Sequence, residues 1–574
     1  MVTANRSVSV ERVDLIAADK ALLSLRSSGH DYRSAVGEVI DNSLEANANG
    51  IRVRLFTAKK KIGKNKKLTE VVERLAIGDD GDGMPIDILH RSLMLGYSSR
   101  YNSRKGMGRF GVGAKLGGIS LAKRIDIYSR QSPADPWMHT YIDLDEISEG
   151  EQKFIPVPDA AQLPDDCADL VGDKGTLVIW SKADHLEETE SGTSRSPDKV
   201  RSELVYYIAR TFRVFLDKGI SIQIDGTDVR PHDPLFLMEG SRQRGDGQAY
   251  PPAEIRVTDS FEFPVPSDPS RTSKVSVTLT LLPRDTRRVR GRGGEGMTER
   301  QFKDNESISI LRAEREIFMG YLRDVQPATE QKQIDRFIGK EIRFEPDLDE
   351  CFQVRNVKKG AEPVDALRDK LSALIHRSIM TMRKEVSTHF DEEEARVQLD
   401  QGVHAEAERI AAETQRTARK PQAGKDMPKE EVERRIDQAA ETLVKDVPEP
   451  LKPAKKAQVK AKIEQQPVTI IPEPWPGQEM LQISHLGSQS LVKLNMQHPF
   501  YQHVYAKLLA AERQDDDAKA KELAKATRLG IDLLIVGYAR AEGQFADTSQ
   551  FDHLRTHWGL EVRTLVEHWR KAGN

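Results

Sequence analysis

Glu38 and Asn42 are the first residues whose types and spacing suggest chemistry. Residues 32–48 carry helical apolar spacing, and side chains four apart on a helix share one face. A carboxylate on that face can activate a water molecule, and a carboxamide oxygen beside it can ligate Mg²⁺. Taken alone, the pair also fits an ordinary polar helix face.

A glycine turn follows an apolar strand at residues 79–83, which read Asp-Asp-Gly-Asp-Gly. A buried Asp79 could accept a hydrogen bond from an exocyclic amine such as that of adenine. Gly81 and Gly83 would let the backbone approach a flat ring closely. A simple glycine turn is the alternative. A calcium loop is disfavoured, because Met84 stands where that pattern needs Asp or Asn before a glycine.

Residues 106–118 form a loop in which six of thirteen residues are glycine, and a helical pattern follows. Backbone N–H groups and a helix start can cradle phosphates there, with Lys105, Arg109 and Lys115 supplying charge. The order of residues is not that of a Walker loop. A Rossmann site is also disfavoured, because the strand and the ribose-binding acid are misplaced. A flexible linker is the simpler alternative.

Gly175 and Thr176 begin a predicted strand, where Thr176 could place a hydroxyl beneath Asp79. Each of the four features is weak alone, but their order and spacing together resemble the Bergerat ATP-binding site of the GHKL superfamily. That superfamily includes gyrase, the heat-shock chaperone, histidine kinases and MutL. The matching elements are Glu38-Val-Ile-Asp41-Asn42, Asp79-x-Gly81-x-Gly83, the glycine lid ending Gly111-x-Gly113, and Gly175-Thr176.

Within this superfamily the chain looks most like bacterial MORC-like ATPases. Residues 108–115, Gly-Arg-Phe-Gly-Val-Gly-Ala-Lys, resemble their Tyr-Gly-x-Gly-x-Lys pattern. Residues 352–359 resemble the segment Phe-Gly-Val-x-x-Asn-Lys-Gln that carries the family's transducer lysine. Lys358 is the best positional match and Lys359 the second, because the family's Asn-Lys is Val-Lys here. The zinc-binding CW module of eukaryotic MORC proteins is absent from the sequence.

The resemblance implies an ATP hydrolase that uses Mg²⁺. Asp79 would read adenine, Asn42 would hold the metal ion, and the lid would close over the γ-phosphate. Glu38 would deprotonate the attacking water, and Lys358 would contact the γ-phosphate from the second domain. The implied nucleotide contacts are Asn42, Asp79, Gly81, Gly83, Gly108, Gly111, Val112, Gly113, Lys115 and Thr176.

The resemblance also implies a homodimer that closes through its N-terminal domains when ATP binds. Basic segments at residues 59–67 and 284–292 favour double-stranded DNA as the substance held, in silencing or anti-phage defence. The alternative is that both basic segments are solubilising loops without a binding role. A heat-shock-type chaperone that remodels proteins is the competing function, and a protein partner encoded in the same operon is also compatible. A histidine kinase and a mismatch-repair endonuclease are disfavoured, because no phosphoacceptor helix precedes the site and no metal-ligand spacing follows it.

Composition limits these functions. The 574 residues include 87 Lys and Arg and 90 Asp and Glu, so the net charge is −3 and any nucleic-acid contact must come from local patches. Two cysteines exclude a disulfide scaffold and a cysteine-rich zinc site, and they fit a reducing compartment. We see no signal peptide and no apolar stretch of membrane-spanning length, so we expect a cytoplasmic protein without a membrane contact.

The elements that must position the site belong to an α/β fold. Short strands are predicted around residues 51–56 and 71–77, and the lysine-rich segment 59–67 would join them as a hairpin connection. The expected organisation is a Bergerat ATP-binding α/β sandwich at residues 1–190, a transducer-like α/β domain at 191–385, a charged helical segment at 386–445, a proline-rich linker at 446–478 and a helical C-terminal domain at 479–574.

Overall fold

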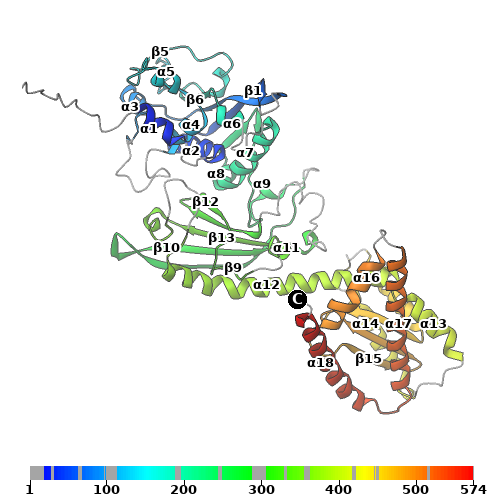
Figure 1. Ribbon diagram of the computed structural model, residues 1–574. Coiled ribbons are helices and arrows are strands. Elements are labelled where there is room, and N and C mark those ends of the chain that lie inside the picture. Colours follow the sequence, from blue (N-terminus) through cyan, green and yellow to red (C-terminus); the bar gives the residue numbers. More distant parts are fainter. Residues whose placement is uncertain are drawn as a thin grey trace, which may run out of the picture. The chain divides into compact units, whose positions relative to one another are not determined.

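The computed structural model describes most of the chain (Figure 1). The described residues are 18–26, 31–62, 67–95, 97, 113–187, 195–243, 248–287, 305–328, 332–353, 362–416, 422–444, 447, 451–513 and 518–572. They form two compact units, the first reaching Arg383 and the second beginning at Lys384. The predicted α/β fold class is confirmed, with sheets in both units.

The first unit contains an eight-stranded sheet, counted over the described residues, in the order β5-β4-β3-β6-β2-β1-β7-β8. Neighbouring strands are antiparallel except β1 and β7, which are parallel. The strands are β1 (Gly50–Ile62), β2 (Lys67–Asp79), β3 (Arg124–Arg130), β4 (Met138–Asp143), β5 (Asp159–Ala160), β6 (Gly175–Ser181), β7 (Ser221–Ile224) and β8 (Thr227–Asp228). Strands β1 and β2 are longer than the periodicity predicted, because they stay paired as a two-stranded ribbon as far as Ile62 and Lys67, through most of the segment expected to be a hairpin connection.

Helices pack on this sheet around one hydrophobic core. They are α1 (Ala18–Leu25), α2 (Tyr32–Glu45), α3 (Ile86–Arg91), α4 (Gly113–Leu121), α5 (Leu144–Glu149), α6 (Asp184–Glu187), α7 (Pro197–Thr211) and α8 (Arg213–Asp217). Val36, Ile40 and Leu204 lie in the same buried cluster as Leu75 and Ile77. Helix α7 and strands β7 and β8 therefore belong to the first domain, which continues beyond the expected boundary at residue 190.

A second, five-stranded sheet of described strands has the order β12-β11-β13-β10-β9. Its strands are β9 (Glu254–Val265), β10 (Asp268–Leu281), β11 (Ile308–Arg312), β12 (Arg315–Gly320) and β13 (Ile338–Phe344), with short helices α9 (Glu239–Arg242) and α11 (Lys332–Asp335) nearby in the chain. Only β11 and β13 pair in parallel. Helix α12 (Asp365–Gln401) follows, and its buried residues Leu367, Leu371 and Ile375 recur every four positions, as a helix face requires.

The second unit combines a three-stranded sheet with helices, over the residues described. Strands β14 (Val468–Glu473), β16 (Gln489–Asn495) and β15 (Leu481–Leu486) lie in that order. The helices are α13 (Ala405–Glu413), α14 (Lys429–Leu443), α15 (Lys452–Gln465), α16 (Ala506–Glu512), α17 (Ala518–Glu542) and α18 (Ser549–Ala572), with a π-helix at Tyr501–Tyr505 before α16. The C-terminal region expected to be helical thus also carries sheet.

The segment expected to be an extended linker, residues 446–478, contains α15 and β14 instead. Pro453 stands in the first turn of α15, where the missing N–H would have no helical partner. Pro472 lies in β14, which is an edge strand of its sheet, where proline is tolerated. Val459 and Ile463 are buried, so this part of the chain is packed. Across the described residues, no helix has the length and apolar character needed to cross a membrane.

Candidate functional site

Helix α2 carries the first predicted pair of site residues. Asp31 caps its N-terminus by accepting a hydrogen bond from the Ser34 N–H over 2.9 Å. Apolar residues of α2 face the core, whereas Asn42 is exposed and Glu38 is half-buried. The carboxylate and the carboxamide therefore lie on the accessible side of a helix that is held on its other side by packing.

Asp79 ends strand β2 and gathers three hydrogen bonds. Its Oδ1 accepts from the Gly81 N–H over 2.9 Å and from the Thr176 N–H over 3.2 Å, and its Oδ2 accepts from the Ser43 hydroxyl over 2.8 Å. The side chain is buried, and this burial raises the pKa of Asp79, while the hydrogen bonds from Ser43, Gly81 and Thr176 oppose the rise. The structure thus brings Asp79, Gly81 and Thr176 together. Thr176 contacts Asp79 through its backbone N–H, whereas the hydroxyl that was expected beneath Asp79 lies 3.0 Å from the Ser129 hydroxyl.

Two glycines allow the turns beside Asp79. Gly83 has φ of +66°, and a Cβ there would lie 2.2 Å from the carbonyl oxygen of Arg130. Gly175 has φ of +129°, and a Cβ there would lie 2.0 Å from the carbonyl oxygen of Asp79. Any other residue at either position would clash with backbone in a strained conformation. The glycines let three backbone segments meet around one carboxylate.

Two serines complete this site and were not identified from the sequence. Ser43 follows Asn42 on α2 and bonds Asp79. Ser129, at the end of β3, accepts from the Met84 N–H over 2.9 Å, donates to the Gly175 carbonyl over 3.0 Å and lies 3.0 Å from the Thr176 hydroxyl. A small polar residue on a buried helix face was the available signal for Ser43. The sequence carries no signal for Ser129, because all of its contacts are with residues distant in the chain.

The other two acids of the glycine turn have structural contacts. Asp80 accepts from the backbone N–H groups of Asn49 and Gly50, over 2.8 and 2.9 Å. Asp82 pairs with Lys174 over 2.8 Å and accepts from Asn47. These bonds tie the turn to the start of β1 and to the loop before β6. Asp79 is therefore the acid of this turn that faces the interior of the site.

Lys115 lies on α4, which begins at Gly113, so the last part of the predicted glycine loop, residues 113–118, is helical instead. Its ammonium group donates to the carbonyl oxygens of Met94 and Tyr97, over 2.9 and 2.6 Å. Burial lowers the pKa of Lys115 to about 8. A half-buried cation held by neutral carbonyls can exchange these partners for a phosphate. Gly113 is the first residue of α4, whereas Gly108, Gly111 and Val112 lie outside the described residues.

The second domain reaches helix α2 through Arg315, the first residue of β12. Its Nε donates to Asp41 Oδ1 over 2.7 Å, and both side chains are almost fully buried. Asp41 stands between Glu38 and Asn42 in the sequence of the helix. Lys358 and Lys359, the predicted transducer lysines, lie outside the described residues.

The predicted basic patches are only partly available for a contact. Lys59 and Lys61 are exposed at the end of β1, but Lys60 pairs with Glu73 and Glu187, over 3.1 and 2.5 Å. Arg287 is fully buried, and its Nε donates to the Leu282 carbonyl over 2.5 Å. The prediction that the basic segment 284–292 contacts DNA is therefore wrong for Arg287, which cannot reach a phosphate from this position.

Of the other arginines in the segment 284–292, the structure describes only Arg284. Arg284 is exposed, and Arg288, Arg290 and Arg292 lie outside the described residues. Periodicity could not distinguish Arg287 from its neighbours, because a single buried arginine leaves no repeat in the sequence.

The site around Asn42 fits an Mg²⁺ ion that binds together with substrate phosphates, and not a metal ion held by protein side chains alone. Over the described residues, no group of three or more His, Cys, Asp and Glu side chains could hold a metal ion. Mg²⁺ usually keeps several waters and takes one or two protein oxygens together with substrate phosphates. The exposed Asn42 carboxamide fits that mode, in which the metal ion arrives with a polyphosphate.

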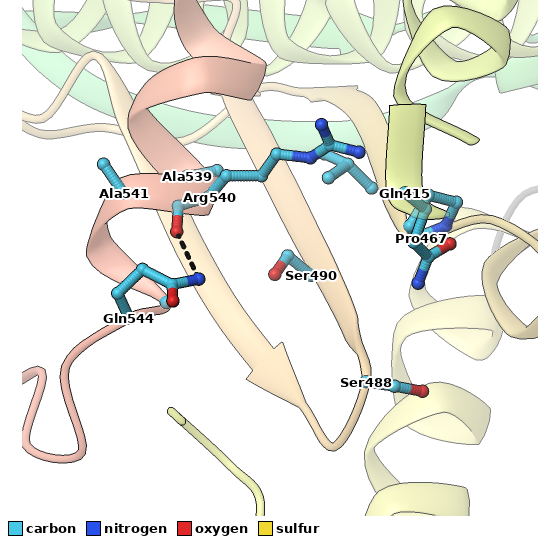
Figure 2. A pocket seen from close by; sticks show the side chains of 10 residues that line it. Gln415, Pro467, Ser488, Ser490, Ala539, Arg540, Ala541 and Gln544 are labelled. Carbon is cyan, nitrogen blue, oxygen red and sulfur yellow. Dashed lines mark hydrogen bonds between the residues drawn. The ribbon is translucent and has the colours of Figure 1, made fainter. Parts of the chain in front are cut away.

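The second unit contains a pocket of about 270 Å³ lined by Ser488, Ser490, Arg540 and Gln544, among others (Figure 2). Arg540 donates to the Ala411 carbonyl and, over 3.0 Å, to the Thr414 hydroxyl at the end of α13. This arginine therefore caps a helix C-terminus. The Ser490 hydroxyl lies 3.0 Å from His485 Nδ1, as part of a buried network. These contacts give Arg540 and Ser490 structural partners within the second unit.

A protein-family comparison matches the part of the first domain that contains most of the predicted site residues. Residues 30–175 match the family described as histidine kinase-, DNA gyrase B- and HSP90-like ATPases. This match supports a GHKL-type ATPase domain in that part of the chain. A search of the curated proteins found no match.

Among solved structures, the chain is similar to the crystal structure of the N-terminal domain of a DNA repair protein. The identity is 14% and the TM-score 0.40, and the similarity covers 64% of this chain and 99% of that one.

Proposed function

We propose that this protein binds and hydrolyses ATP, dimerises through its first domain when ATP is bound, and closes as a clamp on DNA. The observation that supports the proposal best is the Asp79 carboxylate. It lies among Ser43, Gly81 and Thr176, beside the accessible helix face of Glu38 and Asn42. These residues, apart from Thr176, lie inside the segment that matches the ATPase family, which ends at residue 175.

Asp79 has the capacity to read an adenine amine. A carboxylate offers about four acceptor sites, and three are used by Ser43, Gly81 and Thr176. Oδ2 carries one of these bonds and Oδ1 carries two, so by this count over the described residues Oδ2 can accept one more. An exocyclic amine is a donor of the right kind. A hydrogen bond to a charged group contributes about 1.5–3 kcal/mol.

The accessible face of α2 would act on the phosphates. A bound Mg²⁺ would neutralise phosphate charge, which is the main requirement of phosphoryl transfer. The Asn42 carboxamide would hold that ion. Glu38, one turn earlier, would orient a water molecule and take its proton at the carboxylate. Lys115 would leave the carbonyls of Met94 and Tyr97 and donate to a phosphate.

The proposed client is double-stranded DNA, held by phosphate contacts that need no particular sequence. Support comes from the exposed Lys59 and Lys61 and from the arginines of residues 288–292. A protein client, as in a heat-shock-type chaperone, is the second candidate. The burial of Arg287 and the pairing of Lys60 favour it, because both reduce the charge available for DNA.

A single set of measurements tests the proposal. Calorimetry with ATP and Mg²⁺ should show binding, and phosphate release should show turnover. Sedimentation should then show a dimer with a non-hydrolysable ATP analogue and a smaller species without it. Retention of duplex DNA that depends on salt separates the two clients, since a chaperone would instead suppress the aggregation of an unfolded protein. Absence of ATP binding would end the proposal.

A further inference from the structure

We infer that Arg315 is a positioning residue for hydrolysis: through Asp41 it holds the helix that carries Glu38, so the second domain sets the rate at which bound ATP is cleaved. This inference rests on the proposed function. It differs from the transducer lysine in its residue and in its target, because Arg315 contacts the protein helix and not a phosphate.

The contacts of Arg315 all serve to fix its direction. Its Nε donates to Asp41 Oδ1 over 2.7 Å, one terminal nitrogen donates to the Glu316 carbonyl over 3.2 Å, and the other lies 3.4 Å from the Tyr207 hydroxyl. The guanidinium carbon lies 5.5 Å from the centre of the Phe212 ring. The arginine is thus held on several sides, and Asp41 is its carboxylate partner on α2.

Helix α2 has room for this approach because of Gly37. A Cβ at Gly37 would lie 2.7 Å from the Tyr207 hydroxyl and 3.3 Å from a terminal nitrogen of Arg315. Gly37 and Asp41 are four residues apart and share a face of the helix. Glycine costs helix stability, so its presence here is explained by the two side chains that press against this face.

The hairpin that delivers Arg315 is unusual. Strands β11 and β12 are joined by Ala313 and Glu314, which have φ of +45° and +71°. Two-residue hairpin turns commonly have left-handed backbone at both positions, but they favour Asn and Gly, so Ala and Glu are uncommon residues at this turn. The turn is held by a hydrogen bond from the Ala313 N–H to the Phe344 carbonyl and by an ion pair of Glu314 with Lys218.

Glu316, the next residue, anchors the same hairpin to the first domain. It pairs with Arg210, and over 2.9 Å with Arg213, a fully buried arginine that also pairs with Glu341 of β13 over 2.7 Å. This network joins α7 and α8 to the second sheet. A movement of that sheet would therefore be transmitted to Arg315, because the strand has little freedom of its own.

Charge makes the coupling strong. Asp41 is buried, and a buried carboxylate without a partner is costly. Burial alone would lower the pKa of Arg315, but Asp41, Tyr207 and Glu38 outweigh this effect and raise it, so the arginine stays charged. Glu38 is thus within electrostatic reach of the same guanidinium. Withdrawal of Arg315 would force α2 to adjust and would change the surroundings of Glu38.

The test compares two arginines of one hairpin. Arg315→Met removes the charge and keeps most of the volume. Arg312→Met is the matched control, because Arg312 also forms a buried ion pair, with Asp349 over 2.5 Å, but entirely within the second domain. Arg315→Lys keeps the charge but cannot make all three polar contacts at once.

Each variant is measured for melting temperature, ATP affinity by calorimetry, and kcat. We expect Arg315→Met to lose roughly 10- to 100-fold in kcat, as a small misplacement of a catalytic group does, with little change in affinity. Arg315→Lys should fall between it and the wild type. Arg312→Met should lower the melting temperature and leave kcat within about twofold of the wild type, since the ion pair that it removes joins Arg312 to Asp349, a residue of the second domain.

The outcomes separate the inference from the proposed function. If wild type neither binds nor hydrolyses ATP, the proposed function fails and the inference falls with it. If wild type hydrolyses ATP and both Arg315 variants keep its kcat, Arg315 has no positioning role. Equal losses of kcat in the Arg312 and Arg315 variants would reduce the effect to stability and overturn the inference. Should Arg315→Met not fold, Arg315→Lys decides: reduced kcat with unchanged affinity supports it, and unchanged kcat refutes it.

Discussion

The hydroxyl of Ser43 donates to Oδ2 of Asp79 over 2.8 Å and joins helix α2 to the turn after β2. Asn42, the proposed metal ligand, is the residue before Ser43. The group proposed to read the base and the group proposed to hold the metal ion are therefore connected through one peptide and one hydrogen bond. The proposed roles nevertheless differ, so a change at Asp79 should act mainly on ATP binding and a change at Glu38 mainly on turnover.

Asp79→Asn should weaken ATP binding by about tenfold or more, because the hydrogen bond to the adenine amine loses its charge and the new amide adds a competing donor. Burial raises the pKa of Asp79, so the folded state favours the protonated carboxyl, and stability falls as the pH rises above the ordinary range of an aspartate. Neutral Asn should therefore not lower, and can raise, the melting temperature at pH 7 without nucleotide. Calorimetry and thermal melts check both expectations. Unchanged affinity would remove Asp79 from the site.

Glu38→Ala should keep ATP binding and lose turnover, because the carboxylate acts on the water and not on the nucleotide. With hydrolysis stopped, the ATP-bound dimer should accumulate, which sedimentation with ATP would detect. The control is Glu45→Ala, since Glu45 lies on the last turn of the same helix, seven residues along. Hydrolysis at the wild-type rate in the Glu38 variant would show that another group is the base.

ATP binding near pH 8 should take up protons through Lys115. Its pKa is lowered to about 8 while it donates to backbone carbonyls, and a phosphate would raise that pKa by stabilising the ammonium form. Affinity should therefore be greatest below pH 8 and fall as the pH rises through this value. Calorimetry in buffers of different ionisation enthalpy measures the uptake.

Lys115→Met should abolish this proton uptake, whereas Lys174→Met should retain it, because Lys174 is a partly exposed partner of Asp82. Proton uptake that persists in the Lys115 variant would assign it to another group.

Replacing Arg288, Arg290 and Arg292 with Ala should weaken duplex binding and flatten its salt dependence, by about 0.9 in slope for each phosphate that is no longer neutralised. Arg287 stays in place, because it is buried and its loss would disturb the second domain. Basal ATPase should persist. Duplex affinity at several salt concentrations is the measurement.

The comparison variant for this experiment replaces the exposed Lys59 and Lys61 with Ala. If only that variant changes the slope, the DNA path follows the end of the β1–β2 ribbon. A wild type without salt-dependent binding, with or without ATP, would favour the protein client.

The local parts of the site could be read from the sequence because local spacing encodes them. Glu38 and Asn42 share a face by helical geometry, and the turn at Asp79 follows from glycines after an apolar run. The strands predicted at residues 51–56 and 71–77 likewise lie within β1 and β2, since alternation marks a half-buried strand.

Tertiary structure alone decided the contacts between distant residues. Arg315 and Asp41 are 274 positions apart, and nothing in the periodicity near either residue indicates the other. The same holds for the burial of Arg287, for β7 joining the first sheet beside β1, and for prolines that stand at a helix start and on an edge strand within a packed segment. A buried charge or a proline is tolerated because a partner or position supplied by the fold removes its cost. A linear pattern records neither that partner nor the strand beside which β7 lies.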